Sequence, residues 1–340
     1  MLVPFSFMKT VPVVPVATAA TGVGDSSFTA NWNAFSGANY YLLDVSLNSS
    51  FSSFVGSYQN YVVVSTSQLV SGLTSNTTYY YRVRAVTGSD SDAMAFVNRV
   101  YTAGGVLSYN EVTATNQLVL DLKSYSIWTK MKAIYPMVGA SAAACAQNLV
   151  SSSFTGTFNG GWTYASTGVT PNGTSGYMDT GLVPSVSIAS QDSMHLSYYV
   201  NQNVKIKAFQ IGVRGANQID AFIGARWDST TNYNEMNTQT NNLKTETNNV
   251  QGFLTLSRII SSEFKYYKSG SLYQTTTMTS IALPNTYTVW TGTLNLTGSM
   301  LFPDTARNAF ASIGDGLTDT EASNFYTAVQ AFQTTLSRQV

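Results

Sequence analysis

Carboxylates are the first residues of this chain to consider for chemistry, because paired acids hydrolyse glycosidic bonds. A retaining glycosidase needs two carboxyl groups about 5–5.5 Å apart, and alternate residues of a strand share one face. Two acidic residues at alternate positions would meet that need. Glu235, Glu246 and Glu263 are isolated, and Asp220 has no acidic residue two positions away. The sequence therefore offers no carboxylate pair along a single strand.

The one histidine and the one cysteine give no nucleophilic site either. His195 follows Asp192 and Ser193, but these neighbours on one predicted strand cannot form a triad without help from elsewhere. Cys145 lies among alanines and is predicted to be a small packing residue, because His195 would have to serve as its base. A single cysteine also excludes an internal disulfide framework. We therefore expect a protein that is not an enzyme, with no cofactor and no metal site.

Aromatic residues are the remaining candidates for binding. Residues 154–181 alternate aromatic and polar types around glycines, which is typical of short strands joined by tight turns. Trp162, Tyr164 and Tyr233 are candidate platforms for a sugar ring if they are exposed on turns. The alternative is that large aromatic side chains such as Trp162 belong to the sandwich core.

Composition narrows the class of protein. A chain of 340 residues is predicted to form two or more domains. Charged residues make up only 10% of it, against roughly 25% in typical soluble domains, and the net charge is zero. A surface rich in Ser, Thr, Asn and Tyr is common on particles and extracellular β-proteins. The balance of charge predicts no nucleic-acid partner, and no apolar run is long enough to span a bilayer.

Residues 1–15 are predicted to form an extended arm stiffened by proline. Residues 8–20 resemble a signal peptide, but Pro12 and Pro15 interrupt its apolar segment. We expect the arm to pack against another subunit in a homo-oligomer, through apolar residues that precede this segment: Leu2, Val3, Pro4, Phe5 and Phe7.

Residues 16–103 carry the pattern of a β-sandwich. Strands are predicted at 28–32, 40–45, 61–65, 79–86 and 93–101. Leu73 followed six positions later by Tyr79 has the spacing of a tyrosine corner, in which the phenol bonds to a nearby backbone group. Together with Trp32, Tyr41 and Val83, this pattern resembles a fibronectin type III domain. The resemblance implies a fibronectin type III-like fold and says almost nothing about function.

Residues 105–340 are predicted to form a second all-β domain, a jelly roll of the concanavalin type. Strands are expected near 195–200, 209–213, 219–224, 252–257, 263–268 and 287–290, with a long exposed hairpin or loop at 232–249. Amphipathic helices are expected at 116–133 and 318–337, the latter starting at a capping box formed by Thr318 and Glu321. Asp315 and Asp319 could suggest calcium, but a helix start attracts carboxylates anyway.

Four ordered motifs of this second region resemble a known module. They are LVLDLKSYSIWTKMKAIYPMVG at 118–139, FNGGW at 158–162, PNGTSGY at 171–177 and ASIGDGLTDTEA at 311–322. They resemble the concanavalin-like (laminin-G-like) domain of bacteriophage virion proteins. The resemblance implies a virion protein, either a capsid decoration or head-fibre component that contacts other virion proteins.

Two alternatives remain open at this stage. One is a tail-associated adhesin that binds a receptor or host and mucosal glycans by weak, multivalent contacts. The other is a secreted bacterial adhesin or glycoside hydrolase. The predicted arm favours the capsid, since a distal adhesin is more often a long trimer with a fibrous shaft.

Overall fold

The computed structural model describes residues 14–204, 206–225, 231–239, 244–246 and 249–340. The chain divides into two compact units, of which one ends at Met94 and also contains Val106–Tyr109. The other unit holds Ala95–Gly105 and Asn110–Val340. The arm residues Leu2, Val3, Pro4, Phe5 and Phe7 lie outside the described residues, so their role stays a prediction.

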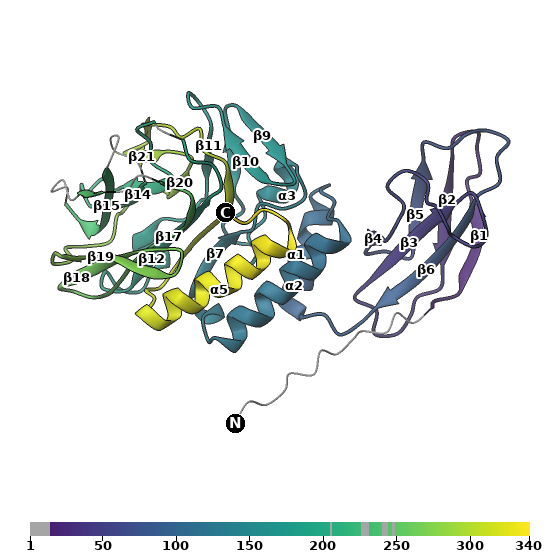
Figure 1. The fold of residues 1–340 in the computed structure, drawn as a ribbon, viewed down its shortest axis with the longest axis horizontal. Coiled ribbons are helices and arrows are strands. Elements are labelled where there is room, and N and C mark those ends of the chain that lie inside the picture. The colour runs from purple at the N-terminus through teal and green to yellow at the C-terminus, as the bar shows by residue number, and fades with distance from the viewer. Residues whose placement is uncertain (1–13, 205, 226–230, 240–243, 247–248) are drawn as a thin grey trace. The chain divides into compact units, whose positions relative to one another are not determined.

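The first unit is a fibronectin type III-like sandwich of two antiparallel sheets (Figure 1). One sheet has the order β1 (Ala17–Thr21), β2 (Ser27–Trp32) and β5 (Ser67–Ser71). The other has the order β4 (Tyr61–Val63), β3 (Tyr40–Ser46) and β6 (Tyr80–Val86).

Residues of β2 and β3 build the core of this sandwich. In β2, Phe28, Ala30 and Trp32 are buried and the residues between them are half-buried. In β3, Tyr41 joins the same core, and its ring lies edge-on to Trp32 at 5.6 Å between centroids. The opposite face of β3 carries the buried Asp44, which forms ion pairs with Arg82 and Arg84 of β6 at 2.8 and 3.0 Å.

The predicted tyrosine corner is confirmed. The hydroxyl of Tyr79 accepts a hydrogen bond of 2.8 Å from the backbone N–H of Thr74. This contact fixes the connection between β5 and β6, because it satisfies a backbone donor that no sheet partner reaches.

The strand predicted at 93–101 is wrong, because this segment is helix α1 (Ser91–Thr102). Its buried residues recur at three or four positions, as on one face of a helix: Ala93, Met94, Phe96, Val97 and Val100. Asp92 in the first turn and Arg99 in the last turn complement the helix dipole. The chain thus forms a helix where a seventh sandwich strand would follow.

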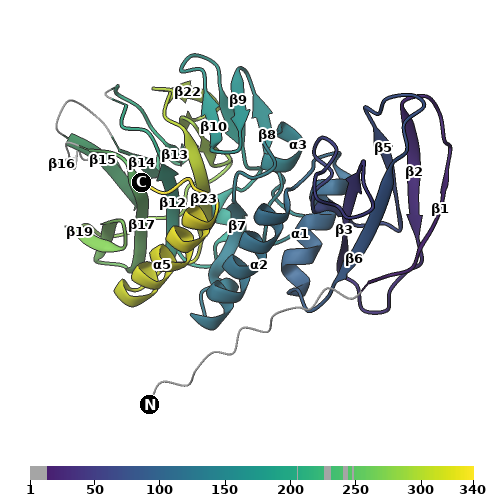
Figure 2. The ribbon, with the colours of Figure 1, turned by 45° about the vertical axis from the view of Figure 1, so that its right-hand side comes forward.

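The second unit is a jelly-roll-type sandwich of two facing sheets with helices against one of them (Figures 1 and 2). The all-β fold class predicted from the sequence is confirmed. The described helices of the chain are α1, which begins in the first unit, α2 (Tyr109–Ser124), the 3₁₀ turn η1 (Trp128–Lys130), α3 (Ala142–Cys145), α4 (Pro184–Ser187) and α5 (Asp319–Thr335).

The helix-covered sheet runs in the order β19 (Ser271–Thr277), β18 (Glu263–Lys268), β17 (Gly252–Ile260), β12 (Met194–Val200), β23 (Asn308–Gly314), β10 (Gly168–Pro171) and β9 (Trp162–Ala165). A further strand, β7 (Met131–Tyr135), pairs with β23.

The second sheet runs in the order β16 (Lys244–Glu246), β15 (Thr231–Thr238), β14 (Asp220–Gly224), β13 (Ile211–Arg214), β20 (Trp290–Thr291), β11 (Tyr177–Asp179) and β8 (Thr157–Asn159). The hairpin of β21 (Leu294–Leu296) and β22 (Ser299–Leu301) joins it at β13. The hairpin expected at 232–249 corresponds to paired β15 and β16, but the prediction that it is exposed is wrong for β15, whose residues 232–238 are buried.

The helix predicted at 116–133 is misplaced. Helix α2 begins at Tyr109 and ends at Ser124, after which Ser126 adopts a left-handed conformation with φ of 59°. The residues from Met131 on form β7 because they complete the ladder on β23. Helices α2 and α5 lie side by side in both views (Figures 1 and 2).

The start of α5 is as predicted. The Thr318 side chain accepts from the backbone N–H of Glu321, and the Glu321 carboxylate accepts from the backbone N–H of Thr318. Phe325 on the buried face of α5 contacts Phe253 and Phe310, with centroids 5.1 and 6.0 Å away. Aromatic contacts therefore hold the helix on the sheet.

Replacing Tyr79 with Phe tests the tyrosine corner. Loss of its hydrogen bond to Thr74 should lower the local stability of the first unit by about 1 kcal/mol. The measurement is amide hydrogen exchange of full-length protein, read by mass spectrometry over the β5–β6 connection. Tyr80→Phe is the matched control, because Tyr80 is 42% exposed. Equal exchange in the two variants would contradict the assignment.

Candidate functional site

Trp162 and Tyr164 do not lie on exposed turns as predicted for sugar platforms. Both belong to β9 and are half-buried against the core of the second unit. Each ring lies edge-on to Phe158 at 5.1 Å between centroids. The indole N–H of Trp162 also donates to the backbone oxygen of Asn159 at 3.0 Å. Their position matches the core alternative, which the sequence had left open.

Tyr233 is also not on an exposed turn. It lies in β15 with only 4% of its surface exposed. It belongs to a small apolar cluster, in which its ring lies 5.0 Å from that of Phe222. Because its face is covered by protein, it does not present the open platform that the sequence analysis expected.

His195 is a buried strand residue, as the sequence predicted. Its Nδ1 lies 2.7 Å from the backbone oxygen of Asp315, and its Nε2 lies 3.1 Å from the hydroxyl of Ser312. A carbonyl oxygen can only accept, so Nδ1 carries the proton and Nε2 accepts from Ser312. Burial lowers the pKa of His195 to about 4. The imidazole is therefore neutral and held by two structural partners.

Cys145 is likewise a core residue, as expected. Its Sγ contacts the backbone oxygen of Val138 at 3.3 Å, and burial raises the pKa of the thiol to about 12. A thiol with so high a pKa has almost no thiolate at neutral pH, so it is a poor nucleophile.

The acidic residues near α5 are engaged by lysines. Asp315 pairs with Lys132 at 2.9 Å, and Asp319 pairs with Lys265 at 2.8 Å. The hydrogen bonds from Lys265 and Tyr267 lower the pKa of Asp319. The described residues contain no cluster of acidic, histidine or cysteine side chains suited to a metal ion.

Asp220 and Glu235 form a pair of acids that no pattern along a single strand reveals. The register of β14 and β15 pairs Phe222 with Glu235 and Asp220 with Thr238. Asp220 and Glu235 therefore lie diagonally on the same face of neighbouring strands. Arg214 donates two hydrogen bonds of 2.7 Å to Asp220, and Thr238 donates to Glu235. These contacts make the pair part of a polar network within the sheet.

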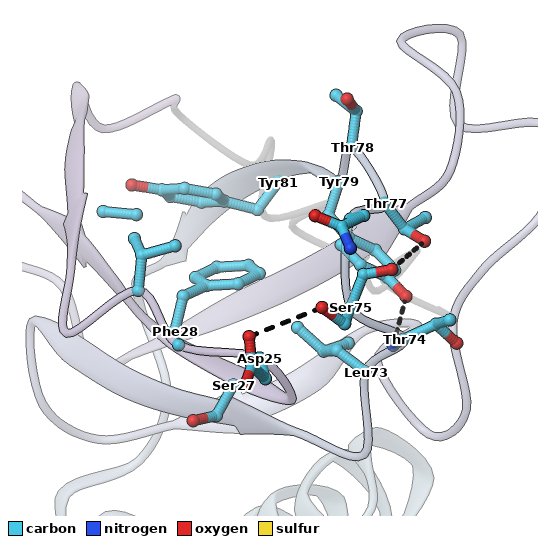
Figure 3. A pocket seen from close by; sticks show the side chains of 14 residues that line it. Asp25, Ser27, Phe28, Leu73, Thr74, Ser75, Thr77, Thr78, Tyr79 and Tyr81 are labelled. Carbon is cyan, nitrogen blue, oxygen red and sulfur yellow. Dashed lines mark hydrogen bonds between the residues drawn. The ribbon is translucent and has the colours of Figure 1, made fainter.

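A pocket of about 520 Å³ lies in the first unit (Figure 3). It is formed by the turn between β1 and β2 and by the connection between β5 and β6. The residues that line it are Ala20, Val23, Gly24, Asp25, Ser27, Phe28, Leu73, Thr74, Ser75, Asn76, Thr77, Thr78, Tyr79 and Tyr81. We take this pocket as the candidate functional site.

Local backbone geometry brings the two walls of the pocket together. Gly72 and Asn76 have φ of 75° and 56°, which lets the β5–β6 connection turn sharply. The backbone N–H of Leu73 then donates to the oxygen of Ser26 at 3.0 Å and ties this connection to the opposite turn. Residues about fifty positions apart thereby face each other.

The inner wall of the pocket is apolar. The rings of Phe28 and Tyr81 lie 5.7 Å apart between centroids, tilted by 32° (Figure 3), and Leu73 packs against the same core cluster. The Tyr81 hydroxyl donates to the backbone oxygen of Thr18, and the Tyr79 hydroxyl accepts from Thr74. Both hydroxyls are thus engaged by backbone groups.

The rim of the pocket is polar. Ser75 donates to the Asp25 carboxylate across a distance of 3.4 Å, and Thr77 donates to the backbone oxygen of Ser75 at 3.3 Å (Figure 3). Both bonds are long for hydroxyl donors, so they are weak. The tyrosine corner was the one sequence signal near this site. It did not reveal the pocket, which depends on two turns distant in sequence.

No protein-family model and no curated protein sequence matches the chain. Among solved structures, it is similar to domain 4 of AbnA, a GH43 extracellular arabinanase from Geobacillus stearothermophilus in complex with arabinotriose. The identity is 16% over 58% of this chain and 98% of that chain, with a TM-score of 0.41.

Two further likenesses are shorter. An Fn3-like protein from Clostridium thermocellum is 29% identical over 23% of this chain and 78% of that chain, with a TM-score of 0.20. The CBM40 of the Ruminococcus gnavus IT-sialidase, bound to α2,3 sialyllactose, is 14% identical over 38% of this chain and 79% of that chain, with a TM-score of 0.30. We assign no ligand from these likenesses. Among the described helices, none has the length and apolar character needed to cross a membrane.

The lowered pKa of His195 has a testable consequence. In the folded protein the imidazole should stay neutral with its proton on Nδ1 down to about pH 5, whereas an unfolded histidine titrates near pH 6.5. Between about pH 6.5 and 4 the unfolded chain binds more protons, so His195 alone should lower the free energy of unfolding as pH falls. The full effect is about 3 kcal/mol.

Burial raises the pKa of Asp304 to about 6. Between about pH 6 and 4, Asp304 should therefore raise the free energy of unfolding as pH falls, which is opposite to the effect of His195. A measurement of global stability would combine the two effects. The clean measurement is therefore the ¹⁵N spectrum of the imidazole. The chain has a single histidine, so the assignment is unambiguous. A titration midpoint above pH 6 would contradict the buried, neutral state.

Proposed function

We propose that this protein is a non-catalytic structural and adhesive component of a bacteriophage particle, displayed as a capsid decoration or head-fibre protein. The observation that supports a non-catalytic protein is that its potentially reactive side chains are either buried or paired. His195 is buried and neutral, Cys145 is buried with a raised pKa, and Asp315 and Asp319 are paired with lysines. Each group stabilises the fold, which leaves none of them poised for acid–base or nucleophilic chemistry.

The composition supports a role in surface display. Only 10% of the residues are charged and the net charge is zero, so neighbouring copies would not repel one another strongly. Two β-sandwich units with polar, uncharged surfaces suit close contact with other virion proteins and with further copies of this chain. The four motifs of the second unit that resemble virion modules supply the particle assignment.

A tail-associated adhesin is the second candidate. The pocket of the first unit favours it, because a preformed cavity with an aromatic wall and a hydroxyl-rich rim is suited to a small polar ligand. Capsid decoration and tail adhesion both require the protein to be part of a particle. One experiment therefore tests the presence of the protein in particles, on which both candidates depend.

The experiment is quantitative mass spectrometry of extracellular particles from a culture that produces the protein, banded on a density gradient. Peptides of this chain should sediment with the particles, in a constant ratio to the major capsid protein across the band. A high ratio indicates decoration of the capsid, and a ratio of a few copies per particle indicates the tail. Recovery of the protein only in the particle-free fractions would contradict a virion role.

A further inference from the structure

We infer that the pocket of the first unit binds a neutral pyranose ring of a surface glycan. This inference rests on the proposed adhesive function and deepens it by assigning a site and a ligand class. It also moves the predicted glycan contact away from Trp162 and Tyr164, which are half-buried against the core, and from Tyr233, which is buried.

The size of the pocket fits a ligand of this kind. A volume of about 520 Å³ falls within the range of about 300–1,000 Å³ usual for small-molecule sites. Its lining combines an aromatic wall with a few polar groups, which is the usual composition of such sites.

The inner wall matches the apolar face of a sugar. A pyranose ring presents C–H groups on its faces and hydroxyls around its edge. Tyr81 and Leu73, both half-buried, offer apolar surface to the pocket, and the buried Phe28 packs against Tyr81 behind it. Because the phenol hydroxyls of Tyr79 and Tyr81 bond to backbone groups, these rings are held in place before a ligand arrives. A preformed wall reduces the entropy cost of binding.

The rim matches the hydroxyls at the edge of a sugar. The carboxylate of Asp25 has two acceptor oxygens, and its contact with Ser75 is a weak one of 3.4 Å. A ligand hydroxyl at normal hydrogen-bond distance would improve on that contact. The hydroxyls of Ser75, Thr74 and Thr77 can both donate and accept, which suits a ligand with several hydroxyls.

The charge of the rim selects against acidic sugars. A carboxylate only accepts hydrogen bonds, and it repels another anion at short range. Asp25 is the only charged residue among those lining the pocket in the described part of the chain. A neutral pyranose is therefore expected to bind, and a sialic acid is expected to be rejected. Single-site binding should be weak, and many copies on one particle would strengthen it.

The test uses the full-length protein and three neutral probes: methyl α-D-glucopyranoside, methyl β-D-galactopyranoside and methyl α-D-mannopyranoside. N-acetylneuraminic acid is the anionic comparison. Binding is followed by ligand-observed NMR and by amide shifts of the labelled protein. At least one neutral probe should shift the amides of 23–25 and 74–78, and the anionic probe should shift them at least tenfold less at equal concentration.

Two variants make the test specific. Ser75→Trp fills the pocket, because the Ser75 side chain points toward Asp25, and it should weaken binding at least tenfold. Ser49→Trp is the matched control at an exposed position outside the pocket and should bind as the wild type does. Asp25→Asn keeps the shape and removes the charge, so it should weaken neutral binding severalfold and narrow the gap to the anionic probe.

Several outcomes would overturn the inference. They are the absence of binding by every neutral probe, unchanged binding in Ser75→Trp, and shifts confined to the second unit. These outcomes leave the particle assignment standing if the chain sediments with virions. Conversely, pyranose binding by a protein that is absent from particles would support this site and defeat the proposed function.

Discussion

The second unit depends on the pairing of β23, whose seven residues are all buried. This strand pairs with β12 along one edge and with β7 and β10 along the other. Ala311 and Ile313 point into the core between the sheets, while Phe310 and Ser312 face the helix side. At its end, a Cβ on Gly314 would collide with the backbone of Lys130 and the ring of His195. One strand thus organises the core, the helix packing and the buried histidine.

The end of the chain is tied to the same strand by Arg338. Its buried guanidinium donates to the backbone oxygens of Met137, Pro136 and Ala309 at 2.7, 3.0 and 3.1 Å, and to the side chain of Gln333 at 2.8 Å. Burial lowers the pKa of Arg338 to about 10, yet the group stays charged at neutral pH. A charge satisfied by several carbonyls is costly to remove, because those acceptors would then be buried without a donor. Arg338 is thus a charged residue with a structural role.

Local patterns in the sequence were enough to predict the fold class. The alternation in β2, the tyrosine corner at Tyr79 and the capping box at Thr318 each depend on neighbours within a few positions. The segment of α1 misled the prediction because its valines and phenylalanine also favour strands. The spacing of its apolar residues by three and four positions, from Ala93 through Phe96 and Val97 to Val100, was the sequence signal that would have identified the helix.

The site was less predictable because it depends on which segments meet. Trp162 and Tyr233 carry types suited to sugar stacking, but pairing of β9 and β15 within the sheets turns their rings against protein. The pocket, in contrast, is lined by small polar residues such as Asp25 and Ser75, which lie on turns fifty positions apart in the sequence. No single stretch of sequence predicts the pocket. The pair of Asp220 and Glu235 is equally hidden in the sequence, because the register of two strands brings these residues together.

The most direct test of the account is imaging of intact particles with a gold-labelled antibody against the first unit. The account predicts label spread over the capsid surface, and label confined to the tail tip would select the adhesin in its place. Particles that stay unlabelled, while the same antibody binds free protein in the lysate, would contradict a role in the virion.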